Sequence, residues 1–205
     1  MFCSTFSRLV GLNMADDPYS VAVENAAGRA ARTPGWTRMG KTMQTEGLQI
    51  KKSSGGNYPR HATHGEVMDS GVHSWELLFT AAASANGNRT MYVGVGREGL
   101  DVEKGNHHKT AAAWYLRTDD GTLYGGGPAD KDKEKPTEKG FQVGDRIGVR
   151  MNCDDGSLRF YKNGETLDAG FPAGTITGPV VGAVELLCSG QALTLVPEAT
   201  SSKTA

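Results

Sequence analysis

The sequence predicts an all-β domain, built either as a sandwich of two sheets or as a barrel. Glycine makes up 28 of the 205 residues, about twice its usual share of ~7%, and together with eight prolines it indicates many turns. From Trp36 onward, short segments rich in β-branched and aromatic residues are separated by glycine-containing turns. About ten such segments, with no helices between them, leave a two-sheet sandwich or a barrel under the rules of layer packing.

The chain is expected to divide into one folded domain and two short flanking segments. Asp16 or Asp17 can cap a short alanine-rich helix that the run Thr33-Pro34-Gly35 ends, so this helix would belong to an N-terminal arm. The first fourteen residues contain one arginine and no acid, which leaves mitochondrial targeting as a weak alternative to a frayed terminus. The expected parts are an arm at 1–35, the domain at 36–198 and a disordered tail at 199–205.

The strands are predicted where β-branched, aromatic and leucine residues cluster between turn signals. In chain order, the segments before residue 125 are Leu48–Lys52, His73–Phe79, Met91–Val95, Ala112–Arg117 and Thr122–Tyr124. Two further strands are predicted near the C-terminal end, at Val180–Leu187 and Gln191–Val196.

The clearest strand pattern lies at residues 147–168. Hydrophobic residues alternate with small or polar ones along its first part, so one face is buried there. Asp154-Asp155-Gly156 and Asn163-Gly164 interrupt the pattern, and Asn-Gly is the strongest short hairpin signal because both residues accept a positive φ. We therefore expect a meander of three strands. The side chains that alternation predicts to be buried, here and in the other strands, are Trp75, Leu77, Val93, Val95, Trp114, Val149, Met151, Leu158 and Phe160.

Residues Gly94–Gly99 spell G-x-G-x-x-G directly after a strand-like segment, which is the spacing of a dinucleotide-binding loop. Such a loop binds pyrophosphate when its last glycine opens a helix, because the N–H groups of the helix N-terminus hold the anion. Here Gly105 and Asn106 follow after five residues, which leaves no room for a three-turn helix. We therefore expect that this segment binds no nucleotide, and we expect no cofactor.

The sequence offers no clear catalytic group, and we expect no enzyme activity. The acid pairs Asp119-Asp120 and Asp154-Asp155 each precede a glycine, where aspartate bonds to the backbone of a turn. Glu76 has no second acid on its strand face to complete the carboxylate pair that glycoside hydrolysis needs. The histidines of His61-x-x-His64 and His107-His108 are interpreted as solvated loop residues, and no metal is expected, because nothing there would bring three or four ligands together.

Charge and cysteine content disfavour several partners and compartments. The 22 basic and 23 acidic residues leave a net charge of −1, without the field of a protein that binds nucleic acid or an anionic membrane. No apolar stretch approaches the ~20 residues of a membrane span. The segment 128–140 interleaves both charge signs and is expected to be a solvated loop. Three scattered cysteines fit neither a disulfide framework nor a metal site, so a reducing compartment, the cytoplasm, is expected.

Five segments spread over residues 36–198 together resemble one known domain. Asp69–Leu77 is similar to a Ser-Gly-x-His-x-Trp-Glu-Val segment, and Met91–Gly96 to a Val-Gly-Val strand. Trp114-Tyr115-Leu116 resembles a central Trp strand, and Gly178–Val181 stands where a Tyr-Pro pair is common. Residues 144–164 are the most specific stretch, matching a Gly-Asp strand, a turn and a Phe-x-x-Asn-Gly hairpin. The domain that these segments resemble is the SPRY domain of the B30.2 group. The likeness to its Val-Gly-Val strand implies that Gly94 and Gly96 are strand glycines.

The resemblance implies a bent sandwich of two antiparallel sheets, jelly-roll and concanavalin-like, that binds proteins and has no catalytic activity. In the family's ubiquitin-ligase adaptors, loops at one rim bind peptide, with a Tyr after the Val-Gly-Val strand and a Trp after a late strand. In this chain Glu185 stands where that Trp would be, and residues 103–109 contain no Tyr. The ligands of those adaptors are therefore not transferred to this chain.

We expect a non-catalytic interaction module, an adaptor or scaffold, that binds a peptide or protein surface through loops 53–60, 103–109 and 185–189. Tyr58 is either an exposed anchor or packed under its own loop. A carboxylate at Glu185 in the centre of this surface would favour a basic ligand. A monomer is expected, and a lectin-like carbohydrate-binding domain is the alternative. The expected ligand-binding residues are Asn57, Tyr58, Arg60, His107, His108, Glu185, Leu186 and Leu187.

Overall fold

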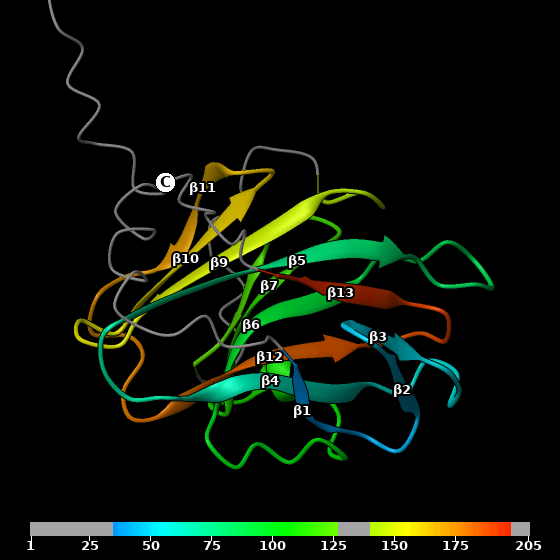
Figure 1. Ribbon diagram of the computed structural model, residues 1–205, viewed down its shortest axis with the longest axis horizontal. Coiled ribbons are helices and arrows are strands. Elements are labelled where there is room, and N and C mark those ends of the chain that lie inside the picture. The colour runs from blue at the N-terminus through cyan, green and yellow to red at the C-terminus, as the bar shows by residue number, and fades with distance from the viewer. Residues whose placement is uncertain (1–34, 127–139, 198–205) are drawn as a thin grey trace, which may run out of the picture. The chain divides into compact units, whose positions relative to one another are not determined.

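The computed structural model describes residues 35–126 and 140–197, whose strands form two sheets (Figure 1). These residues belong to the second of the two units into which the chain divides, Ala31–Ala205. Every described strand pair is antiparallel, so the predicted all-β sandwich of two antiparallel sheets is confirmed. The predicted helical arm, the tail at 199–205 and most of the segment 128–140 lie outside the described residues.

The two sheets differ in size, and each mixes strands from distant parts of the sequence. Sheet A has six strands in the order β1-β4-β12-β6-β7-β8. Their bounds are Trp36–Met39 (β1), Arg60–Met68 (β4), Val180–Leu186 (β12), Met91–Arg97 (β6), Ala113–Arg117 (β7) and Leu123–Gly125 (β8). Sheet B has seven strands in the order β11-β10-β9-β5-β13-β3-β2. Their bounds are Glu165–Phe171 (β11), Ser157–Lys162 (β10), Arg146–Asn152 (β9), Val72–Ala81 (β5), Ala192–Val196 (β13), Gln49–Lys52 (β3) and Met43–Glu46 (β2).

One short helical element interrupts the β structure in the described part of the chain. It is the 3₁₀ turn η2, His107–Lys109, which lies in the connection between β6 and β7. No helix in the described ranges is long and apolar enough to cross a membrane.

The predicted meander is formed by β9, β10 and β11. Asn163 and Gly164 connect the last two of these strands with φ angles of +53° and +88°, the positive values that favour Asn-Gly at this position. The Asn163 side chain also accepts a hydrogen bond from the backbone N–H of Arg146, at 2.8 Å. In the preceding turn, the Asp155 carboxylate accepts a bond from the backbone N–H of Ser157, at 2.8 Å. The turn residues therefore act as the sequence predicts.

The main hydrophobic core lies between the inner faces of the two sheets. Eight of the nine side chains predicted to be buried are at most 2% exposed. The ninth, Trp75, is partly buried and packs against this core. The alternation in the sequence therefore identifies the inner faces of β5, β6, β7, β9 and β10 correctly.

Gly94 and Gly96 are strand residues on β6, as predicted. A Cβ added at Gly94 would lie 2.1 Å from the carbonyl oxygen of Trp114 on the neighbouring strand β7, so the glycine permits the close approach of the two strands. Gly99 has a φ of +76° and occupies a turn that leads into an extended connection rather than a helix. Residues 94–99 therefore lack the geometry of a pyrophosphate-binding loop.

Three strands are not predicted by the sequence pattern: β1, β2 and β4. The nine residues of β4 include His61, Thr63 and His64, all of them buried. Polar residues on both faces of a strand give no apolar alternation, which explains the missed prediction. β4 is nevertheless the strand that joins the edge strand β1 to β12 in sheet A.

Candidate functional site

The connection between β6 and β7 covers part of the outer face of sheet A, the face directed away from sheet B. This connection, residues 98–112, is called the strap below. Leu100 of the strap forms a small hydrophobic cluster with Tyr92, Tyr115 and Ala183 of the sheet. Sheet A is therefore buried on both faces where the strap crosses it.

Glu185, on β12, lies beneath the strap and is fully buried. Its Oε1 accepts a hydrogen bond from His108 Nδ1 at 2.8 Å, and its Oε2 accepts one from the backbone N–H of His108 at 3.2 Å. The His108 ring stacks on Tyr92, with centroids 4.1 Å apart. The prediction that Glu185 and His108 form an exposed polar surface is wrong, because the strap covers both residues and they bond to each other.

Two more histidines share this buried cluster. His61 Nε2 lies 3.5 Å from Glu185 Oε2, and the His61 and His107 ring centroids are 4.5 Å apart. His107 Nε2 donates to the carbonyl oxygen of Asp101 at 2.9 Å. Burial lowers the pKa of His61 to about 4, although the charge of Glu185 opposes this shift. The interpretation of His61, His107 and His108 as solvated loop residues is therefore wrong.

His64 lies on the opposite face of β4, inside the main core. Its ring packs edge-on against Trp36 and Trp75, with centroid distances of 5.4 and 5.2 Å. A Cβ added at Gly182 would lie 2.3 Å from this ring, so the glycine provides the space that His64 fills. Burial lowers the pKa of His64 to about 3. The prediction of a solvated histidine is wrong here too, and His64 acts as a neutral core residue.

An exposed aromatic side chain lies beside the strap. Tyr58 is 58% exposed, and the guanidinium of Arg60 lies 4.4 Å from its ring centroid. Arg60 Nε is 3.3 Å from Glu103 Oε2 of the strap, and Glu103 Oε1 accepts a hydrogen bond from the backbone N–H of Lys41 at 2.8 Å. Glu103 thus ties the turn between β1 and β2, the loop before β4 and the strap to one another.

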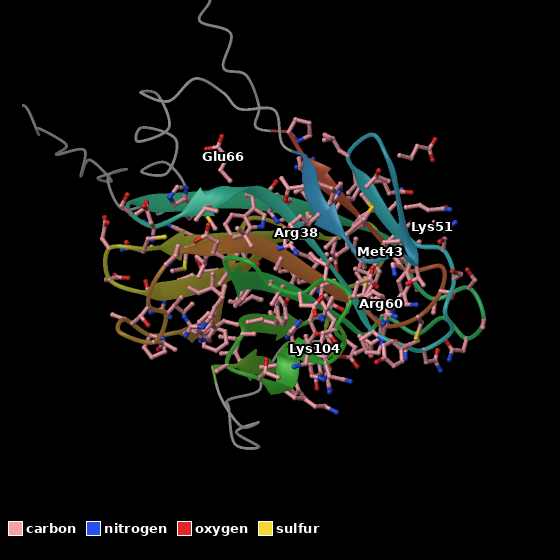
Figure 2. The ribbon with its side chains drawn as sticks, turned by 90° about the horizontal axis from the view of Figure 1, so that it is seen from below. Arg38, Met43, Lys51, Arg60, Glu66 and Lys104 are labelled. Atoms are coloured by element: carbon pink, nitrogen blue, oxygen red, sulfur yellow. The ribbon has the colours of Figure 1, made fainter. Side chains whose placement is uncertain are left out.

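This surface, made by Lys41, residues 53–60 and residues 101–106, is called the rim. Figure 2 labels two of its residues, Arg60 of β4 and Lys104 of the strap. Gly105 also faces the loop before β4, because a Cβ added there would lie 3.5 Å from the Tyr58 ring. The structure therefore brings two of the three predicted loops together, 53–60 and 103–109.

The third predicted segment, 185–189, lies behind the rim rather than on it. Leu186 is fully buried in the main core and pairs with Arg60 across β12 and β4. Leu187 is partly buried and packs against the cluster beneath the strap. Of the predicted binding residues, Asn57, Tyr58 and Arg60 are those with exposed or partly exposed side chains at the rim.

Lys41 was not predicted as a member of the site, and Glu103 was included only within loop 103–109, not among the named binding residues. No local pattern marks them, because the turn that carries Lys41 follows an unpredicted strand and Glu103 acts through an ion pair formed over 43 positions of sequence.

One acid of each pair considered for catalysis bonds a local backbone N–H of its own turn, as predicted, namely Asp120 and Asp155. The other two bond residues that are distant in sequence, and Asp119 accepts a hydrogen bond from Thr90 Oγ1 at 2.9 Å. Asp120 accepts a hydrogen bond from the backbone N–H of Thr122 at 2.9 Å and pairs with Arg117. Asp154 accepts one from the backbone N–H of Gly71 at 2.7 Å. Within residues 35–126 and 140–197, no group of three or more His, Cys, Asp or Glu side chains is arranged to hold a metal ion.

Two grooves on the described surface lie outside the rim. One has a volume of about 450 Å³ and lies on the outer face of sheet A, where its lining includes Thr37, Thr63 and Val181. The other has a volume of about 320 Å³, and its lining includes Leu123 and Phe171. Neither groove is lined by a residue of the rim.

Comparison with known proteins agrees with the architecture. The chain is similar in structure to the SPRY domain of human HERC1, with a TM-score of 0.61, 20% sequence identity, and coverage of 80% of this chain and 99% of that one. It is also similar to a human SPRY domain, with a TM-score of 0.57, 18% sequence identity, and coverage of 80% of this chain and 99% of that one. For the TRIM65 PSpry domain the TM-score is 0.61 and the identity 16%, with coverage of 85% of this chain and 97% of that one. A search of curated proteins finds no match. A sequence model of the SPRY domain matches residues 72–198, more than half of the chain, and the chain therefore belongs to the SPRY domain family.

Proposed function

We propose that this SPRY domain binds a short peptide or a protein surface through the rim. The observation that carries the proposal is the exposure of Tyr58, whose ring is 58% accessible while Arg60 stacks on it. A fixed aromatic ring offers a large contact area at a low cost in conformational entropy. The Arg60–Glu103 pair supports this arrangement by holding the guanidinium in place.

We further propose that the ligand carries acidic side chains. The basic ligand expected from the sequence depended on an exposed Glu185, and that carboxylate is buried and bonded to His108. At the rim, Lys41 and Lys104 are exposed, whereas the Glu103 carboxylate is bonded to Arg60 and Lys41. With Arg60 and the exposed Asp101 included, the rim carries three basic and two acidic side chains. Its net charge is therefore positive, which attracts carboxylates and repels basic groups.

The proposed contact has one aromatic anchor and a polar surround, so its affinity is expected to be moderate. We expect a Kd in the micromolar range, about 8 kcal/mol of binding free energy. The domain is proposed to act as a non-catalytic monomer in a reducing compartment, with the cytoplasm as the expected location. Cys153 and Cys188 are free thiols, in agreement with that compartment.

Selection from a displayed peptide library tests the proposal. Wild-type protein should return acidic motifs, and the Tyr58→Ala variant should bind the selected peptides at least about tenfold more weakly, a loss of ~1.4 kcal/mol. Val72→Ala is the control, because Val72 is a partly exposed side chain on β5, in sheet B. Equal affinity for wild type and Tyr58→Ala would refute the proposal. Binding to a glycan array instead of peptides would favour the lectin-like alternative.

A further inference from the structure

The carboxylate of Glu185 fastens the strap to sheet A from below. Both of its oxygens accept hydrogen bonds from a single strap residue, His108, at 2.8 and 3.2 Å. Glu185 is on β12, 77 positions farther along the chain, so these bonds join two segments that no local interaction holds together. Hydrogen bonds to an ionised acceptor are among the stronger ones in proteins.

The carboxylate of Glu185 is paired with histidines. In the described residues, its ion-pair partners are His61, on β4, and His108, in the strap. A buried carboxylate is costly unless it is paired, because the protein interior solvates it poorly. The position of the strap therefore depends on the protonation of this cluster. The titratable and charged groups that face the cluster from the surrounding elements are Arg60 and His61 of β4, Tyr92 of β6, Tyr115 of β7, Tyr124 of β8, and His107 and His108 of the strap.

The strap carries one side of the rim. Glu103 lies five residues before His108 in the same segment, and it contacts Arg60 and the backbone of Lys41. If the strap leaves sheet A, Glu103 leaves Arg60. The guanidinium then loses its ion pair, while its hydrogen bond to the carbonyl oxygen of Pro59 lies within its own segment. The strap thus contributes residues both to the buried cluster, through His107 and His108, and to the exposed rim, through Glu103.

We propose that Glu185 is a positioning residue for the rim: its buried carboxylate holds the strap where Glu103 meets Arg60, and acidification releases the strap. The effect on ligand binding rests on the proposed function of the rim, whereas the fastening of the strap can be tested without any ligand.

The direction of the pH effect follows from the cluster. Burial lowers the pKa of His61 to about 4, compared with ~6.5 for an exposed histidine. Release of the strap uncovers His61, because His107 of the strap packs against its ring. Between these two pKa values the released state binds a proton that the closed state does not, so a fall in pH from about 6.5 to about 4 favours release of the strap.

Hydrogen exchange of the intact chain tests the fastening. In Glu185→Ala, amide protons of residues 100–110 should exchange about ten- to a hundredfold faster, because the two bonds to His108 are lost. Glu185→Gln keeps an acceptor for the His108 N–H and should show a smaller increase. Glu98→Gln is the control, because Glu98 is an exposed acid at the start of the strap, and it should behave as wild type. Amides of β9 should be unchanged in all three variants, and unchanged strap exchange in Glu185→Ala would overturn the proposal.

If Glu185→Ala does not fold, wild-type protein decides the question over a pH series. After correction for the intrinsic exchange rate, the strap should lose protection at a higher pH than β9 does. Simultaneous loss in both segments would overturn the proposal. A peptide selected at pH 7 should also lose affinity at the pH where the strap is released. A failure to select any peptide would count against the proposed function alone, because the exchange experiment needs no ligand.

Discussion

The imidazole of His64 packs edge-on against the indole of Trp75, with ring centroids 5.2 Å apart, and this contact joins sheet A to sheet B. Burial lowers the pKa of His64 to about 3, compared with ~6.5 for an exposed histidine. Between these values the unfolded chain binds a proton that the folded chain does not. The free energy of unfolding should therefore fall as the pH falls from about 6.5 to about 3, with His64 contributing about 1.4 kcal/mol per pH unit.

Urea unfolding between pH 4.5 and 6 measures this contribution. A His64→Gln variant should be less stable than wild type at pH 7, because it disrupts the packing against Trp75. Its stability should nevertheless depend less steeply on pH, by about 1.4 kcal/mol per unit. Identical slopes for the two proteins would show that His64 is protonated in the folded state.

Gly94→Ala should destabilise the fold. The added Cβ would lie 2.1 Å from the backbone oxygen of Trp114, and a backbone atom cannot move aside without separating β6 from β7. We expect a loss of about 2 to 3 kcal/mol in the free energy of unfolding, measured by urea denaturation. Gly35→Ala is the control, because a Cβ there meets no atom within 4 Å. A neutral effect of Gly94→Ala would contradict the strand assignment.

Phe160→Ala tests the core of sheet B. Phe160 is fully buried, and we expect its truncation to cost about 3 to 5 kcal/mol if the site cannot collapse. Its neighbour Arg159 is exposed on the other face of β10, so Arg159→Ala should change the stability by no more than about 0.5 kcal/mol. Comparable losses in both variants would mean that the inner and outer faces of β10 are assigned incorrectly.

Arg60→Ala separates binding from stability. Arg60 is partly exposed, and ion pairs such as the one with Glu103 contribute about 0 to 1 kcal/mol to folding. Loss of the guanidinium should nevertheless weaken ligand binding about tenfold, because it both covers Tyr58 and attracts acidic groups. Titration calorimetry with a selected peptide gives the affinity, and thermal unfolding gives the stability. A variant with unchanged affinity would exclude Arg60 from the site.

Much of the fold follows from patterns that are local in the sequence. Strand alternation and the Asn163-Gly164 turn identify the meander of β9 to β11, because a strand buried on one face repeats every two residues. β4 is not identified in this way, because distant segments bury its polar residues. His61 packs against His107 of the strap, and Thr63 bonds to Thr37 of β1. Their burial is a tertiary property that β4 itself does not encode.

The site was predictable only in part for the same reason. Tyr58 and Arg60 stand out as a loop aromatic and a neighbouring cation, and their loop is at the rim. Glu185 and His108 look like surface groups in the sequence, because charged residues are rarely fully buried unless they are paired. The hydrogen bond between them joins residues that are 77 positions apart. Only the folded chain therefore shows that the two side chains are paired and buried together.

The central proposal is that a ligand binds at the rim. The decisive measurement is the hydrogen-exchange footprint of a selected acidic peptide on the intact wild-type chain at pH 7. We expect protection confined to residues 53–60 and 101–106, with little change elsewhere in the described sheets. Protection of the groove beside Thr37, Thr63 and Val181, with residues 53–60 unaffected, would contradict it.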